Sequence, residues 1–198
     1  MNSNRIAVLD KVRGLAIILM MLDHTLVMLS TLEIISNGAL LTRMTLTRFA
    51  LPMFMIVSGA LWAARTPGGK RIGSIILVSI FLNVFMVMFW SEFSTPEVLA
   101  VWALAALFAS FISKYPVLAI TLSYIQWEYW PIGWDGYQPG VVVLFLAVGV
   151  LAARCGIVPG TGVAGKLLPE FLGVIGKRPI IWYAGHLVVL TVLVAISR

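Results

Sequence analysis

Long apolar runs separated by short polar breaks fill almost the whole chain. A helix that crosses the hydrocarbon core of a bilayer needs about 20 mostly apolar residues. The breaks hold turn-forming residues, such as Thr66-Pro67-Gly68-Gly69 and Ser94-Thr95-Pro96. We expect spanning helices over residues 6–32, 45–64, 72–90, 98–112, 116–130, 139–153 and 179–196. The pattern therefore predicts an all-α polytopic membrane helical bundle of about seven transmembrane helices, forming one domain over residues 1–198.

A weaker apolar run over residues 166–176 does not fit this series. It is too short to span a bilayer, and Pro169 and Glu170 interrupt it. We expect a short interfacial helix there rather than a further span.

The composition supports lipid as the solvent of this chain. Hydrophobic residues make up 61% of the sequence and charged residues 11%, whereas a soluble domain carries about 25% charged residues. The net charge of +6 alone would suit nucleic acid, but the basic residues are scattered between apolar runs instead of clustering on a soluble face. We therefore expect a lipid bilayer and no nucleic acid as partner.

The cysteine content and the N-terminus exclude further classes. Cys155 is the single cysteine, so the chain forms no internal disulfide, and we expect no metal site. The first apolar run is long, is punctuated by polar residues and lacks a small-residue cleavage site, so we expect no signal peptide.

The placement of lysine and arginine predicts the orientation, because cytoplasmic loops carry an excess of these residues. With the N-terminus in the cytoplasm, that side collects most of them: Arg5, Lys11, Arg13, Arg65, Lys70, Arg71, Lys114, Arg154, Lys166, Lys177 and Arg178. The acidic residues Glu33, Glu92, Glu97, Glu128 and Asp135 fall outside. We expect a multi-pass protein of the inner (cytoplasmic) membrane.

Ionisable residues inside spans are costly, so each one suggests a functional site. Arg13 and His24 lie eleven residues apart, close to three helical turns, so they share a face about 16 Å apart along the axis. Guanidinium suits phosphate, and imidazole titrates near neutral pH. Asp23 points about 100° away from His24 and could pair with Arg48. Snorkelling of Arg13, a structural Asp23–Arg48 pair and an interhelical hydrogen bond of His24 are the alternatives.

The second and last spans hold further polar candidates. The second contains Pro52 and Ser58-Gly59, which on physical grounds indicate close helix packing more often than a site. The last begins after Lys177-Arg178, a pair that usually sets topology, and carries Tyr183 and a second intramembrane imidazole, His186.

The run from Leu9 to His24, with Arg13-Gly14 and Asp23-His24, resembles the opening of the membrane-bound acyltransferases. It is most similar to the catalytic domain of heparan-α-glucosaminide N-acetyltransferase and its bacterial relatives. Weaker similarities follow in the same order along the chain: Arg48 to Gly59, Asp135 to Pro139, and Gly176 to Pro179 followed by Tyr183 and His186. The chain lacks the polar residues of related fourth helices, and it is shorter than most members.

The resemblance implies a membrane acyltransferase that moves an acetyl or other acyl group from cytoplasmic acyl-CoA to a hydroxyl or amine. The acceptor would be a glycan or lipid-linked molecule, and a homodimer is one oligomeric state left open. By this resemblance His24 would be the general base beside Asp23, and Arg13, with Lys177 and Arg178, would hold the CoA phosphates. The implied acceptor-site residues are Arg48, Ser58, Tyr183 and His186, with Ser58 or Tyr183 donating to the oxyanion.

Two other functions compete with this interpretation. Asp23, His24 and His186 could form the relay of a small proton-coupled transporter, although we detect no internal repeat. The chain could also be a non-catalytic scaffold within a larger membrane complex. The enzymatic hypothesis requires that Arg13 and His24 point together into a polar cavity enclosed by the other helices.

Overall fold

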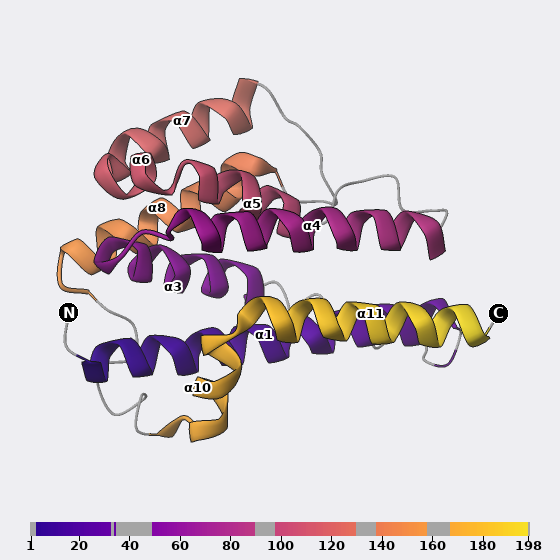
Figure 1. Ribbon diagram of the computed structural model, residues 1–198. Coiled ribbons are helices and arrows are strands. Elements are labelled where there is room, and N and C mark those ends of the chain that lie inside the picture. Colours follow the sequence, from indigo (N-terminus) through magenta and orange to yellow (C-terminus); the bar gives the residue numbers. More distant parts are fainter. Residues whose placement is uncertain are drawn as a thin grey trace.

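The computed structural model describes residues 3–32, 34, 49–89, 98–129, 138–157 and 167–197. All regular structure within these ranges is helical, which confirms the all-α prediction. The helices are α1 (Ser3–Thr31), α3 (Ala50–Ala64), α4 (Gly69–Phe89), α5 (Val98–Leu107), α6 (Ala109–Lys114), α7 (Pro116–Tyr129), α8 (Pro139–Arg154), α10 (Glu170–Lys177) and α11 (Pro179–Ser197) (Figure 1).

The helices have the lengths and surfaces of a multi-pass membrane protein. Three are long and apolar enough to cross a bilayer, over Ala7–Ser30, Gly69–Phe89 and Pro179–Ile196, and α3, α5 and α8 are shorter apolar helices. The outer face of α4 leaves large apolar side chains uncovered: Leu77 is 69% exposed and Met88 75% exposed. Such a face is costly in water and costs nothing against lipid tails, so the bundle suits a bilayer.

The predicted span over residues 98–112 needs correction, because two helices occupy it. α5 ends at Leu107, Phe108 adopts φ −95° and ψ 11°, and α6 begins at Ala109. Each piece is shorter than a bilayer requires. In the second predicted span, the described helix begins at Ala50, and residues 45–48 lie outside the described part.

The short helix expected over residues 166–176 is present as α10, and it is fastened to the N-terminal half of α1 by glycines. A Cβ atom at Gly14 would lie 2.0 Å from the carbonyl oxygen of Leu172. A Cβ atom at Gly176 would lie 1.7 Å from the carbonyl oxygen of Asp10. Only glycine permits this approach, which is the small-residue packing used between membrane helices.

A second pair of glycines joins α3 to α8. Cβ atoms at Gly59 and Gly149 would each lie 2.0 Å from a carbonyl oxygen of the facing helix, that of Leu146 and that of Ile56 respectively. The Gly59 position confirms the close packing that Ser58-Gly59 predicted. These two glycine-built pairs, α1 with α10 and α3 with α8, are the most extensively packed helix pairs in the described part of the chain.

The order of the helices brings the start of α1 and the turn between α3 and α4 to the same end of the bundle (Figure 1). α3 runs opposite to α1, so its C-terminal residues Val57 and Ala60 pack against Leu9 near the start of α1. α11 lies beside the later part of α1 (Figure 1). The two ends of α1 therefore meet different neighbours.

Candidate functional site

A pocket of about 680 Å³ opens where α1, α10 and the turn between α3 and α4 meet. Five basic residues line it and Asp10 is the one acidic residue in the lining. The basic residues are Arg13, Arg65, Lys70, Arg71 and Lys177. A pocket with this excess of positive charge favours a polyanionic ligand.

Arg13 is the buried member of this set, and its side chain is held from two sides. Its Nε donates a hydrogen bond of 2.6 Å to the carbonyl oxygen of Gly176, and its Nη2 lies 2.8 Å from Oδ1 of Asp10. Arg13 and Asp10 are only 5% and 7% exposed. Arg13 therefore does not snorkel to the headgroups. It ties α10 to α1, and its charge is partly balanced by Asp10.

The other four cations are exposed and able to meet a ligand: Arg65, Lys70, Arg71 and Lys177. Gly69, in the same lining, begins the 21-residue helix α4, and Gly68 precedes it. Amide groups and the helix dipole make such an N-terminus favourable for phosphate. Charge and backbone therefore point to the same kind of ligand.

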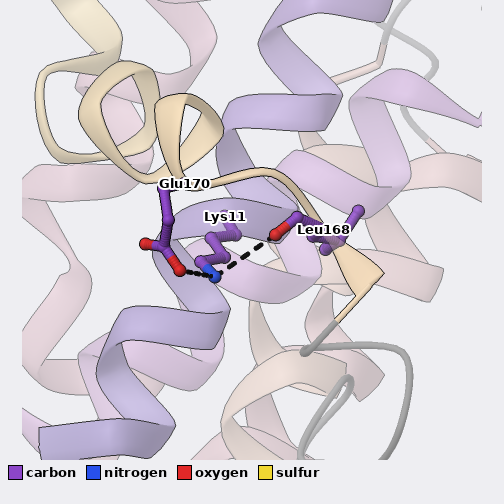
Figure 2. Close-up of polar contacts among 3 residues, drawn as sticks. All are labelled: Lys11, Leu168 and Glu170. Atoms are coloured by element: carbon purple, nitrogen blue, oxygen red, sulfur yellow. Dashed lines mark hydrogen bonds and ion pairs between the residues drawn. The ribbon is translucent and has the colours of Figure 1, made fainter.

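Lys11 does not line this pocket, and its side chain has partners on the segment that leads into α10 (Figure 2). Its Nζ lies 2.5 Å from Oε1 of Glu170 and donates a hydrogen bond of 3.2 Å to the carbonyl oxygen of Leu168. These contacts join α1 to the start of α10.

Three rings meet at the other end of α1. The imidazole of His24 lies edge-on to the ring of Tyr183, with centroids 5.5 Å apart and an interplanar angle of 61°. It stacks on the imidazole of His186, with centroids 6.0 Å apart and an angle of 23°. Tyr183 is 4% exposed. The ring cluster of His24, Tyr183 and His186 thus joins the two imidazoles that the sequence singled out.

A small apolar cavity of about 20 Å³ lies between the basic pocket and the ring cluster. Its lining includes Ile17, Met20, Phe54 and Trp102, and Tyr183 borders it as well. The described residues therefore do not form the single polar cavity that the enzymatic hypothesis requires. Arg13 lines an open basic pocket, whereas His24 packs against two rings and is partly exposed, and apolar side chains lie between them.

The remaining predicted residues are distributed unevenly. Lys177 lines the basic pocket, whereas Arg178 is exposed beside it and outside the lining. Ser58 is buried, and its neighbour Val57 packs against Leu9 on the N-terminal half of α1. Asp23 is half-buried next to His24. Arg48, and with it the predicted Asp23–Arg48 pair, lies outside the described residues.

Sequence reasoning missed three residues of the basic pocket, Arg65, Lys70 and Arg71, which it used only for topology. Their signal was present in the sequence Arg65-Thr66-Pro67-Gly68-Gly69-Lys70-Arg71, where cations flank a pair of glycines ahead of a helix. Such a segment offers both charges and backbone amides to an anion.

Comparison with known proteins identifies one family. The family model described as heparan-alpha-glucosaminide N-acetyltransferase, catalytic, matches residues 5–131, which is more than half of the chain. The match includes α1 and the basic turn before α4, and it stops before α10 and α11. No curated protein and no solved structure matches the chain.

Proposed function

Because the chain belongs to the heparan-alpha-glucosaminide N-acetyltransferase catalytic family, we propose that it transfers an acyl group from cytoplasmic acyl-CoA to a membrane-proximal acceptor. The acyl group is acetyl or a related chain, and the acceptor offers a hydroxyl or amine on a glycan or lipid-linked molecule. The observation that carries this proposal is the basic pocket at one end of α1, with the His24 ring cluster at the other.

The basic pocket supports the donor half of the proposal. Coenzyme A carries a pyrophosphate and a further phosphate, and these groups need several cations and amide donors at once. Arg65, Lys70, Arg71 and Lys177 supply exposed charge around the start of α4. Arg13 supplies a fifth positive charge from its buried position in the lining. Arg178, outside the lining, adds to the positive electrostatic potential.

The distance between the two ends of α1 supports the catalytic half. Eleven residues of helix separate Arg13 from His24, about 16 Å along the axis, which is comparable to the reach of a pantetheine arm. A donor whose phosphates sit in the basic pocket would bring its thioester toward the ring cluster. The apolar cavity between the two sites, which Tyr183 borders, has a volume of about 20 Å³, room for about one water molecule. The proposal therefore requires the side chains that line this cavity to move apart when the donor binds.

The reaction assigned to this site is nucleophilic acyl transfer. The acceptor oxygen or nitrogen attacks the thioester carbonyl as the imidazole of His24 takes its proton. The carbon–sulfur bond then breaks, and the CoA sulfur leaves with that proton. Tyr183, against His24, is better placed than Ser58 to donate to the oxyanion. Asp23, Arg48 and His186 complete the site in this proposal.

The membrane arrangement in this proposal has about seven spans, the N-terminus in the cytoplasm and the basic pocket on the cytoplasmic side of the inner membrane. The clustering of five cations at one end of the bundle supports that orientation, because positive charge is retained on the cytoplasmic side. It also places the pocket where acyl-CoA is available.

The decisive experiment compares donor binding with acyl transfer in purified protein. His24→Ala should lower acyl transfer by about 10²- to 10⁴-fold, because a positioned base is lost, while acetyl-CoA binding measured by calorimetry stays near the wild-type value. Thr191→Val, at a buried site on α11, is the matched control for folding. Absence of acetyl-CoA binding to the wild-type protein would refute the proposal.

A further inference from the structure

His186 on α11 lies against α1 at the turn that carries His24. Its imidazole stacks on that of His24, with centroids 6.0 Å apart and an interplanar angle of 23°. The ring also lies near the backbone of Met21, one turn before His24. Both neighbours place the ring of His186 against the same turn of α1.

The polar atoms of His186 do not account for this contact. Its Nε2 is buried without a hydrogen-bond partner in the part of the chain that the structure describes. This nitrogen therefore makes no hydrogen bond to His24, and the two rings meet by packing. The ring of His186 offers His24 a flat, nearly parallel surface.

Tyr183 closes the arrangement from the same helix. Tyr183 and His186 are three residues apart on α11, so their side chains share a face of that helix. Tyr183 meets His24 edge-on while His186 meets it face-on. A ring bounded on its edge and on its face has little freedom to rotate within a packed bundle.

We propose that His186 is a positioning residue for His24: its stacked ring holds the base of the reaction in one orientation. This inference rests on the proposed acyltransferase function and assigns His186 no contact with the substrate. Misplacing a reacting group by about 1 Å costs on the order of 100-fold in rate, so orientation of His24 alone can have a large effect.

The first test separates positioning from chemistry by kinetics, using variants of the full-length protein. His186→Ala removes the ring and should lower kcat on the order of 100-fold. His186→Phe keeps a flat ring for stacking, and it should recover most of that loss. The KM values for acyl-CoA and acceptor should stay within about threefold of wild type in both variants. Both substitutions affect the orientation of His24, and neither removes a contact with a ligand.

The second test works whether or not the protein turns over acyl-CoA. The chain has two histidines, so histidine-labelled, untagged protein in detergent gives two imidazole signals by NMR, and His186→Phe leaves that of His24 alone. Removal of the stacked ring in His186→Ala should shift the His24 ring signals, and Thr191→Val should leave them in place.

Two outcomes would overturn the inference. His24 ring signals that do not change in His186→Ala would show that the two rings are not in contact. His186→Phe as inactive as His24→Ala, with a raised acceptor KM, would make His186 a base or a substrate ligand. If wild-type protein transfers no acyl group while the NMR shift is observed, the acyltransferase proposal fails and the ring contact stands.

Discussion

The two ends of α1 are surrounded by different kinds of side chain. At Arg13, charges surround an open pocket of about 680 Å³, and four of the five cations are exposed. At His24, the rings of Tyr183 and His186 pack against an imidazole that is partly exposed, and the nearby cavity of about 20 Å³ is lined mainly by apolar side chains. The first end can attract and hold a charged ligand from water, and the second can hold a ring in one orientation by packing.

Electrostatic attraction therefore acts at the Arg13 end of α1, and side-chain packing acts at the His24 end. Exposed charges are screened by solvent, so several are needed to hold one anion, and losing one of them costs little. Packed rings position one another through their shape, so one substitution in the ring cluster should strongly disturb the position of its neighbours. Substitutions at the two ends should therefore differ in size and in the quantity that they change.

Arg13 is the exception at the charged end, and it should give the largest effect. Arg13→Ala leaves the carboxylate of Asp10, which is 7% exposed, without its 2.8 Å partner, and frees the carbonyl of Gly176. Breaking a buried pair from one side costs about 3–5 kcal/mol of unfolding free energy. We expect a clear loss of thermal stability in detergent, measured by the unfolding of purified protein.

The double variant Asp10→Asn with Arg13→Ala is the control for this prediction. It removes the unpaired carboxylate charge and should recover part of the lost stability. Equal stability of Arg13→Ala and wild type would mean that Arg13 is an ordinary pocket cation, and that the charged end has no buried member.

Tyr183→Phe should give the next largest effect, now at the ring-built end. The substitution keeps the ring that meets His24 edge-on and removes only the hydroxyl. Loss of one oxyanion donor lowers kcat on the order of 100-fold, so kcat should fall while the donor Kd is unchanged. Steady-state kinetics with acetyl-CoA, together with calorimetry, measure both quantities. A kcat close to wild type would remove Tyr183 from the chemistry and leave it a packing role.

Single exposed cations of the basic pocket should have smaller effects, confined to donor binding. Lys70→Ala removes one of several charges near the start of α4, and about 1 kcal/mol is typical for an exposed ion pair, or about fivefold in the Kd of acetyl-CoA. Lys114→Ala is the matched control, because Lys114 is an exposed lysine outside the pocket lining. Equal weakening by both variants would show that net charge, and not this pocket, attracts the donor.

Much of the fold could be predicted from the sequence, because a long run of apolar residues predicts a helix in lipid. The expected span over residues 72–90 is α4 (Gly69–Phe89), and that over residues 179–196 is α11 (Pro179–Ser197). The break at Phe108 was not accessible, since no proline or glycine marks it between Leu107 and Ala109. Such a break depends on tertiary packing, which local propensity does not describe.

The sequence predicted individual residues of the candidate site, but not the contacts between them. Helical periodicity placed Arg13 and His24 on one face, and in the structure both face the C-terminal helices, Arg13 toward Gly176 on α10 and His24 toward His186 on α11. The pairing itself joins residues more than 150 positions apart in the chain. A single sequence carries no signal for such a contact, so the stacking of the two imidazoles could not be predicted.

The smallest effect should come from the contact between Lys11 and Glu170 (Figure 2), because one of its two side chains is exposed to solvent. Their atoms lie 2.5 Å apart, but the side chain of Glu170 is 91% exposed. Solvent-screened pairs contribute about 0–1 kcal/mol, so Lys11→Met should lower the unfolding free energy by less than about 1 kcal/mol. The acetyl-CoA Kd should not change, because Lys11 does not line the basic pocket. A loss near that of Arg13→Ala in the same unfolding assay would show that α10 is held by this ion pair and not by its glycine contacts with α1.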